Sequence, residues 1–434
     1  MDIRLYTPKY RPNRVRKNME FRYIRDNVNK KHMAHNLLNE IEIGSKNGLL
    51  KKRIITHYMH NGSSTIPDLA RELNLSVPTV TKFINEMCDD GYINDYGKLE
   101  TVSGRHPSLY GLNPESGYFI GVDIKKFTLN IGLMNFKGDM VDLKMNIPYK
   151  FKNTAEGLEE LCVLVREFIR ETGIETGKIL NVNLNISGRV NPESGYSFST
   201  FNFSERPLAE VLREKIGCNV CIDNDTRAMT YGELVQGCVK GEKDILFVNI
   251  SWGLGIGIII DGKIYTGKSG FSGEFGHVNA FDNEILCHCG KKGCLETEAS
   301  GSALHRTLLE RIARGESSIL SERAAEAENP ITMDEIIEAV EKEDLLCIEI
   351  VEEIGQKLGR QIAGLISIFN PELVIIGGTL SLTGDYIIQP IRTAVRKYSL
   401  NLVNRDAVII QSGLKAKAGV VGACMLARSR VFES

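Results

Sequence analysis

The chain has 434 residues, of which 42% are hydrophobic and 25% are charged. This length predicts two or three domains with ample apolar core, and the composition excludes wholesale disorder. No apolar run reaches the roughly 18 residues that span a bilayer, and the basic N-terminus lacks the apolar segment of a secretory signal, so we expect a cytoplasmic protein without membrane contact.

Charge is distributed unevenly along the chain. The formal net charge is −2, but residues 1–113 hold 18 lysines and arginines against 12 acidic residues, whereas the remainder holds 35 against 43. A basic front end on an acidic body indicates that the front end binds a polyanion, with chance asymmetry as the alternative.

The first 47 residues form the most basic part of this front end. Residues 1–47 contain few long apolar stretches, so we expect a basic arm or a loosely attached helix. Residues 49–60 then repeat apolar side chains at helical spacing until Asn61-Gly62 ends the pattern. We place the start of the first globular domain at residue 48.

Two short helices joined by a three-residue turn follow. Ser64 is the expected N-cap of the first helix, and Ser76 that of the second. This arrangement is the helix-turn-helix pattern. Residues 92–113 alternate and turn like a β-hairpin wing, so residues 48–113 predict a winged helix-turn-helix.

From residue 117 the pattern becomes α/β, and we treat residues 114–434 as a second unit. The order of three strands, helix, strand, helix, strand, helix occurs twice, which predicts two related lobes with a ligand cleft between them. The expected strands are 117–123, 128–135, 140–146, 179–186, 219–223, 244–250, 255–261, 263–267, 372–377 and 406–410. The expected helices are 155–170, 206–215, 226–238, those from 297 onward, 385–398 and a closing helix.

Three of the ten cysteines are clustered. His277, Cys287, Cys289 and Cys294 supply one nitrogen and three sulfurs, the donor set of a tetrahedral structural Zn²⁺ site. The alternative is three loop cysteines near an unrelated histidine. His288 lies between two ligands, so we expect its side chain to point away.

The run GEFGHVNAFDNEILCHCGKKGCLETEASG resembles the zinc and sugar signature of the ROK family of repressors and sugar kinases. GVDIKKFTLNIGLMNFKGD, CIDNDTRAMTYGE, SWGLGIGIIIDG and PELVIIGGTLSLTGDYIIQPIRTAV resemble further motifs of that family in the same order. The resemblance implies a fold class of α/β with an N-terminal winged helix-turn-helix and a two-lobed, actin/hexokinase-like domain that carries a zinc knuckle.

The resemblance also implies a sugar site. The positions that match the family's sugar-binding motifs are Gly188, Arg189, Asn224, Asp225, Glu274, His277 and Glu296. Paired carboxylates and amides suit a pyranose, whose hydroxyls both donate and accept hydrogen bonds. SGRVNPESG is similar to the N-acetylmannosamine kinase branch, which favours an N-acetylated hexosamine as the effector.

Both phosphate loops depart from those of the family's kinases. Asp225 matches the catalytic base, but Lys125, Lys126 and Phe127 replace the first glycine-rich loop. Trp252, the only tryptophan, replaces the phosphate-contacting threonine of the second. Because phosphoryl transfer depends on positioning and charge stabilisation, we expect no catalysis, with Asp225 left as a vestigial base.

These features predict a sugar-responsive transcriptional regulator, most simply a repressor, that binds operator DNA as a homodimer or homotetramer. The residues expected at DNA are Pro78, Thr79, Thr81, Lys82 and, in the wing, Arg105. The effector would be a small sugar or sugar phosphate. The alternatives are a bifunctional, ATP-dependent sugar kinase and an adaptor that uses the winged helix for protein contacts.

Overall fold

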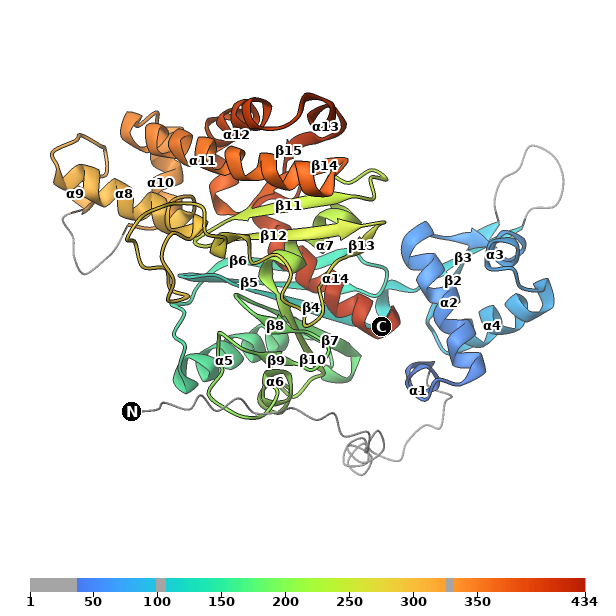
Figure 1. The fold of residues 1–434 in the computed structure, drawn as a ribbon. Coiled ribbons are helices and arrows are strands. Elements are labelled where there is room, and N and C mark those ends of the chain that lie inside the picture. Colours follow the sequence, from blue (N-terminus) through green and yellow to red (C-terminus); the bar gives the residue numbers. More distant parts are fainter. Residues whose placement is uncertain (1–36, 99–106, 325–330, 434) are drawn as a thin grey trace, which may run out of the picture.

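The structure is a computed structural model that describes residues 37–98, 107–324 and 331–433. The chain forms a small N-terminal domain beside a body of two lobes (Figure 1). Arg105 and the arm residues before 37 lie outside the described residues, so the predictions made for them stay predictions. None of the described helices is both long and apolar enough to cross a membrane.

The N-terminal domain is a winged helix-turn-helix. Its elements are α1 (Leu37–Glu42), α2 (Lys46–Asn61), β1 (Ser64–Thr65), α3 (Ile66–Leu73), α4 (Val77–Asp89), β2 (Ile93–Lys98) and β3 (Ser108–Leu112). The strands form a sheet in the order β1-β3-β2, in which β2 and β3 pair antiparallel as the expected hairpin.

Local capping explains where its helices begin. Ser76 caps α4 as predicted, because its hydroxyl accepts a hydrogen bond from the backbone N–H of Thr79. The prediction for α3 was wrong by one residue: Thr65, not Ser64, is the N-cap and accepts from the N–H of Asp68. Ser64 and Thr65 together form β1, in which they pair with Tyr110 and Leu109 of the wing.

The described end of the predicted arm is packed helix rather than loose chain. Leu37 of α1 is fully buried, and the buried ammonium of Lys51 on α2 lies 3.1 Å from Glu40 of α1 and 2.9 Å from Glu86 of α4. One lysine thus connects three helices. Helix α2 itself begins at Lys46, three residues before the predicted start.

The first lobe contains residues 114–236. Its elements are β4 (Tyr118–Ile124), β5 (Thr128–Asn135), β6 (Met140–Pro148), α5 (Ala155–Glu171), β7 (Ile179–Ile186), β8 (Val190–Asn191), β9 (Tyr196–Ser197), α6 (Leu208–Ile216), β10 (Val220–Asn224) and α7 (Asp225–Gln236). The second lobe's elements are β11 (Ile245–Ile250), β12 (Leu254–Ile260), β13 (Lys263–Ile264), α8 (Gly301–Ala313), α9 (Ser321–Ala324), α10 (Met333–Glu341), α11 (Leu345–Phe369), β14 (Leu373–Gly377), α12 (Asp385–Tyr398), α13 (Asn401–Asp406) and β15 (Val408–Gln411). The last helix, α14 (Ala418–Phe432), returns to the first lobe.

The two large sheets have the same topology. The first has the order β10-β7-β4-β5-β6 and the second β13-β12-β11-β14-β15. In each, the first three strands along the chain form an antiparallel meander. The fourth strand pairs in parallel with the first, and the fifth pairs in parallel with the fourth. The predicted repeat of two related lobes is therefore confirmed.

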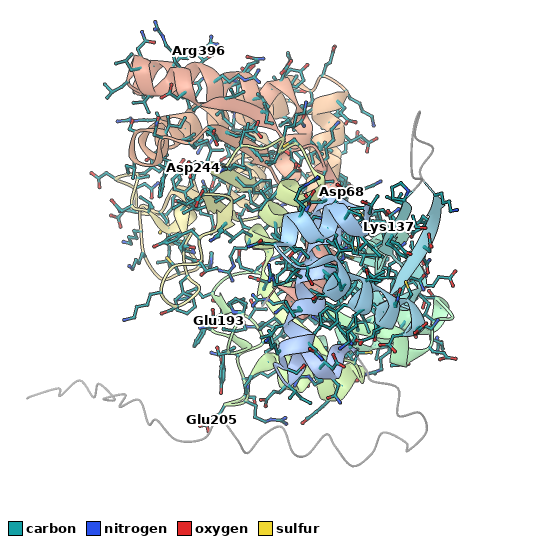
Figure 2. The ribbon with its side chains drawn as sticks, turned by 90° about the vertical axis from the view of Figure 1, so that its right-hand side faces the viewer. Asp68, Lys137, Glu193, Glu205, Asp244 and Arg396 are labelled. Atoms are coloured by element: carbon teal, nitrogen blue, oxygen red, sulfur yellow. The ribbon has the colours of Figure 1, made fainter. Side chains whose placement is uncertain are left out.

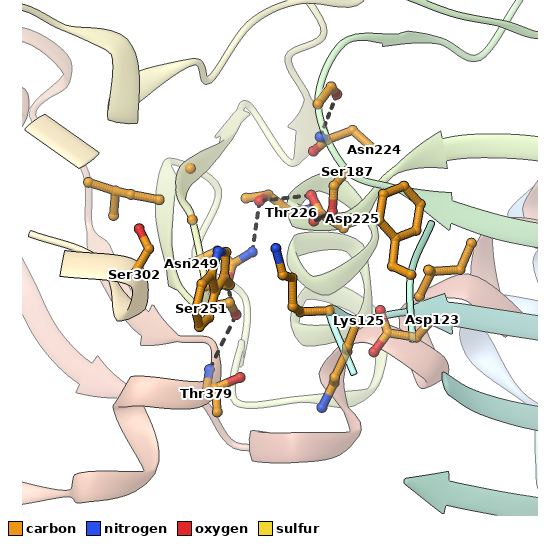
Figure 3. Close-up of a pocket in the computed structure, with 18 of the residues that line it drawn as sticks. Asp123, Lys125, Ser187, Asn224, Asp225, Thr226, Asn249, Ser251, Ser302 and Thr379 are labelled. Atoms are coloured by element: carbon orange, nitrogen blue, oxygen red, sulfur yellow. Dashed lines mark hydrogen bonds between the residues drawn. The ribbon is translucent and has the colours of Figure 1, made fainter. Parts of the chain in front are cut away.

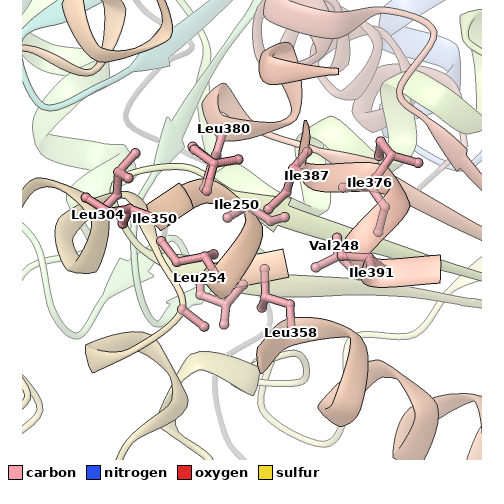
Figure 4. Packing of buried hydrophobic residues seen from close by; sticks show 14 of the residues in the cluster. Val248, Ile250, Leu254, Leu304, Ile350, Leu358, Ile376, Leu380, Ile387 and Ile391 are labelled. Atoms are coloured by element: carbon pink, nitrogen blue, oxygen red, sulfur yellow. The ribbon is translucent and has the colours of Figure 1, made fainter. Parts of the chain in front are cut away.

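Each lobe has its own apolar core. In the second lobe, Val248 and Ile250 of β11 pack with Ile376 of β14 against residues of α11 and α12 (Figure 4). In the first lobe, the inward faces of the strands pack against α5 and α6. Since burial of apolar area supplies most of the folding free energy, each lobe is stabilised largely from within.

A third core joins the N-terminal domain to the body through the end of α14. Phe432 is 1% exposed and packs its ring against Phe119 and Phe136 at centroid distances of 6.5 and 5.3 Å. The same cluster includes Ile54 and Tyr58 of α2. Figure 2, turned by 90°, shows the N-terminal domain in front of the lobes, near the labels of Asp68 and Lys137.

Candidate functional site

A cavity of about 500 Å³ lies between the two lobes. The first lobe contributes the ends of β4, β7 and β10 and the start of α7, and the second contributes the β11–β12 turn and residues from 272 to 296. Its volume lies in the range of about 300–1,000 Å³ that is typical of small-molecule sites. The predicted cleft is therefore present.

Asn224 and Asp225 lie at the start of α7 on the first-lobe wall. Asn224 caps the helix, accepting from the N–H of Arg227, and its Nδ2 donates to the carbonyl of Gly188 at 3.0 Å. Ser187 Oγ donates to Asp225 Oδ2 at 2.6 Å, and Asp225 Oδ1 accepts from the N–H of Thr226. Burial raises the pKa of Asp225 because desolvation disfavours its charged form.

The second lobe contributes a cluster of carboxylates and imidazoles. His277 Nε2 lies 3.8 Å from Glu274 Oε2, and both residues line the cavity. Glu296 is buried and accepts from the N–H of Leu254 at 3.0 Å. Burial alone would raise the pKa of Glu296, but hydrogen bonds from His288 and Leu254 outweigh it and the pKa is lowered.

His288 does not point away as predicted. Its Nδ1 lies 2.9 Å from Glu296 Oε1, and the side chain lines the cavity. The expectation was wrong because a tight turn at Gly290 (φ 85°) returns the chain to the cavity, which sequence spacing does not show.

Of the two adjacent residues Gly188 and Arg189, only Gly188 lines the cavity. Gly188 lies on the cavity wall with φ 88°, and its carbonyl is held by Asn224. Arg189 is not among the lining residues: its backbone N–H and its Nε both approach Ser199 Oγ, at 3.1 and 3.2 Å. Its side chain thus contacts the loop after β9 instead of the cavity.

The four predicted metal ligands converge. The donor atoms of His277, Cys287, Cys289 and Cys294 all lie within 4.8 Å of one another. Cys287 Sγ is 3.6 Å from His277 Nδ1, and Cys289 Sγ is 3.6 Å from Cys294 Sγ. Zn–S bonds of about 2.3 Å at the tetrahedral angle put two sulfurs about 3.8 Å apart, so these residues fit a four-coordinate zinc ion.

The two altered phosphate loops touch each other across the cleft. Lys126 Nζ lies 5.0 Å from the centroid of the Trp252 ring, within cation–π range. The ring of Phe127 packs edge-on against Trp252 at 5.9 Å. Sequence reasoning identified each substitution, but not that they come from opposite lobes and meet.

A hydrogen-bonded strip of polar side chains, which sequence reasoning missed, lines the second-lobe wall (Figure 3). Asn249 Nδ2 donates to Thr226 Oγ1 at 2.9 Å, and Ser251 Oγ donates to Asn249 Oδ1 at 2.7 Å. Asn249 is the one polar residue of β11, next to its last residue Ile250, and this polar interruption is the signal that could have found it.

The outer face of α4 is exposed in the N-terminal domain. Val80, Phe83, Ile84 and Met87 are buried, and the opposite face presents the residues predicted to meet DNA. Pro78 and Lys82 are exposed and Thr79 and Thr81 are half-buried. Thr81 Oγ1 donates to the carbonyl of Val77, and Lys82 Nζ lies 3.8 Å from Glu86.

Together the fold and cavity define a two-lobed, sugar-kinase-like domain behind a winged helix. The family profile described as ROK matches residues 119–430, and that of the winged helix-turn-helix DNA-binding domain matches residues 49–94. The chain belongs to the ROK family.

Relatives of two kinds are found. The chain is 30% identical over 362 residues to a xylose repressor of Caldicellulosiruptor bescii, covering 82% of this chain and 89% of that one. It is 29% identical over 320 residues to a glucokinase of Halalkalibacterium halodurans, and this match covers 72% of this chain and 96% of that one. The structure of a ROK family transcriptional regulator, a homologue of the E. coli MLC protein, superposes with a TM-score of 0.73 at 25% identity, covering 89% of this chain and 96% of that one.

Proposed function

We propose that this protein is a DNA-binding transcriptional repressor whose affinity for operator DNA is controlled by a sugar. The observation that carries the proposal is a winged helix and a cleft between two lobes in one chain, with Lys126, Phe127 and Trp252 in the place of the phosphate-binding residues of the family's kinases. Its similarity to a xylose repressor along most of both chains supports this function.

The sugar would bind between the lobes. The residues that we assign to hydroxyl recognition are Gly188, Asn224, Asp225, Glu274, His277 and Glu296, all of which line the cavity. Carboxylates and amides accept and donate in pairs, which suits vicinal hydroxyls. Arg189 would act indirectly, by holding Ser199 and the loop after β9.

The effector itself is a small sugar or a sugar phosphate, and the likeness of residues 187–195 to N-acetylmannosamine kinases favours an N-acetylated hexosamine. Ser187, newly recognised in the cavity, would hold the Asp225 carboxyl in place for a hydroxyl of that sugar.

Loss of kinase activity is part of the proposal. A polyphosphate needs backbone N–H groups that approach it closely and open space for its oxygens. The Trp252 indole, which lines the cavity and is contacted by Lys126 and Phe127, would take up that space. The rival is a bifunctional kinase, which the retained Asp225 favours. Incubation with ATP and a hexose panel decides between them, since appreciable sugar phosphate would refute a purely regulatory role.

Zinc would have a structural role. His277, Cys287, Cys289 and Cys294 would complete a closed tetrahedral shell, and Glu296 follows the last ligand by two residues. The ion would therefore hold Glu296 and His277 in position on the cavity wall. Elemental analysis should give close to one zinc per chain.

The exposed face of α4 would enter the major groove, with Pro78, Thr79, Thr81 and Lys82 at bases or phosphates, and Arg105 of the wing in the minor groove. Operators read by winged helices commonly have two half-sites, so we expect a homodimer or homotetramer.

Helix α14 is the element that would connect sugar binding to DNA. At its N-terminal end, the carbonyl of Gly419 accepts from Asn185 Nδ2 at 2.9 Å, and a Cβ at Gly419 would lie 2.4 Å from the carboxyl carbon of Asp123. Asp123 lines the cavity. Because Gly419 of α14 packs directly against Asp123, a shift of Asp123 in the cavity wall would move the helix.

The other end of α14 is attached to the winged helix. Thr56 Oγ1 of α2 donates to the carbonyl of Phe432 at 3.2 Å, and His60 Nε2 lies 2.8 Å from Glu433 Oε1. Lobe closure around a sugar would thus change the orientation of α2 and α4, and with it the spacing of two reading helices in an oligomer.

The experiment is a gel shift with DNA from upstream of the protein's own operon, at a stated salt concentration, with and without each sugar of a panel. Specific binding that one sugar releases supports the proposal. Absence of DNA binding in every condition would favour the adaptor alternative.

A further inference from the structure

Phenylalanines crowd one short segment at the mouth of the sugar cavity. Phe198, Phe201 and Phe203 lie within six residues after β9, and Phe198 and Phe203 are 46% and 48% exposed. Large exposed aromatic side chains next to a pocket are costly in water and commonly mark a binding surface.

This segment is held rigidly against the cavity. Phe201 is buried with φ 54°, in the left-handed region that non-glycine residues rarely adopt, and its N–H donates to Asn153 Oδ1 at 2.5 Å. Its ring packs against Phe151, a lining residue, at a centroid distance of 5.3 Å. Backbone strain of this kind persists where surrounding packing fixes it, often at a ligand site.

An aromatic surface made by Tyr196, Phe198 and Phe271 bridges the two lobes here. The rings of Phe198 and Phe271 meet edge to face at 5.3 Å, and Tyr196 lies 6.2 Å from Phe198. Phe198 comes from the first lobe, and Phe271 follows β13 in the second.

The three rings of the aromatic surface do not line the sugar cavity themselves, but residues near two of them in the chain do. Thr200 and Ser272, which line the cavity, are two and one residues from Phe198 and Phe271. Thr200 Oγ1 donates to the carbonyl of Ser187 at 3.0 Å, and Ser187 in turn holds Asp225. Hydrogen bonds thus connect Asp225 through Ser187 to Thr200, which is two residues from Phe198 in the chain.

The opposite side of the cavity is lined by Trp252, which Lys126 and Phe127 contact. The cavity also extends from there to Thr332 and Thr379. Arg189 adds hydrogen-bond donors on the Phe198 side of the cavity. Its Nε donates to Ser199 Oγ, whereas its two terminal nitrogens donate to none of the described residues.

We propose that Tyr196, Phe198 and Phe271 form a second carbohydrate subsite, and that the effector is a disaccharide or other glycoside instead of a free monosaccharide. The C–H-rich face of the second pyranose would stack on the Phe198 ring, whose π face carries partial negative charge. This inference rests on the proposed function, because it extends the same sugar pocket.

The test is isothermal titration calorimetry on the full zinc-loaded chain with three matched pairs of probes: glucose and cellobiose, xylose and xylobiose, and N-acetylglucosamine and N,N′-diacetylchitobiose. For at least one pair we expect the disaccharide to bind about tenfold more tightly than its monosaccharide. Phe198→Ala should remove that advantage and leave the Kd of the monosaccharide within about twofold, whereas Phe198→Tyr should keep it.

Tyr398→Ala is the control, because it removes a ring that is 49% exposed on α12, outside the cavity lining. Phe271→Ala is the second variant, which tests the surface from the other lobe should Phe198→Ala fail to fold. If monosaccharides bind as tightly as every disaccharide, or if Phe198→Ala weakens both members of a pair equally, the subsite is refuted while the sugar-responsive function stands. If no saccharide binds, both are refuted.

Discussion

Phe432→Ala is expected to uncouple the winged helix from the sugar-binding body. The Phe432 ring is 1% exposed, between Phe119 and Phe136, at the junction of α14 with α2. An aromatic ring buries roughly 150–250 Å², which at about 25 cal/mol per Å² corresponds to about 4–6 kcal/mol as an upper bound. Large-to-small substitutions of buried phenylalanine typically cost about 3–5 kcal/mol, in agreement with this range.

The lost stability should appear as local opening of the junction between α14 and α2, because each lobe has a core of its own. Amide hydrogen exchange read by mass spectrometry should show at least about hundredfold faster exchange in α2, because 1.4 kcal/mol corresponds to a factor of ten. Strand β11, inside the second lobe, is the internal control. In gel shifts, the variant should still bind DNA but respond less to sugar.

Tyr398→Ala is the matched substitution, because it removes an aromatic ring from a position on α12 that is 49% exposed, outside the cavity lining and outside the junction cluster. It should change neither α2 exchange nor the DNA response to sugar. Unchanged protection of α2 in Phe432→Ala, together with a full sugar response, would refute the role assigned to α14.

The pH should affect the same junction. The hydrogen bond that His60 donates to Glu433 raises the pKa of His60, so this contribution is complete below about pH 6.5 and is lost as the pH rises through the raised value. Glu433 has a pKa of about 2, because its hydrogen bonds, led by that from His60, outweigh its burial, so its contribution is lost only as the pH falls below about 4.3 toward that value. The His60 side chain is 51% exposed, so the effect on α2 exchange should be only about 0.5 kcal/mol, and His60→Gln should abolish it. Lys82→Ala should weaken binding to all DNA sequences similarly and lower the slope of log affinity against log salt by about 1; an unchanged slope would remove Lys82 from the interface. Cys294→Ser should lose zinc and weaken sugar binding by about tenfold as Glu296 loses its support, whereas Cys88→Ser, in the winged helix, should retain the metal; equal zinc contents in both variants would contradict the ligand assignment.

Features encoded over a few residues could be read from the sequence. The spacing of His277, Cys287, Cys289 and Cys294 predicted a set of ligands that does converge, because two tight turns bring the cysteines together within the segment. Strand β7 and helix α12 lie within a residue of their predicted bounds, since apolar periodicity is a local signal. The error at Ser64 shows the limit: two adjacent hydroxyl residues can both cap a helix, and only the structure shows that α3 begins at Ile66, directly after Thr65.

Contacts between distant segments were decided only by the tertiary structure. Lys126 and Trp252 are 126 positions apart, and the sequence predicted that each replaces a phosphate-contacting residue. Their packing against each other depends on how the two lobes face. The contact of Glu433 with His60 is of the same kind. The sequence therefore determined the two domains and the chemistry of their motifs, because these follow from local patterns. Tertiary packing decided which motifs meet, because side chains remote in the chain approach one another only after the cores have formed.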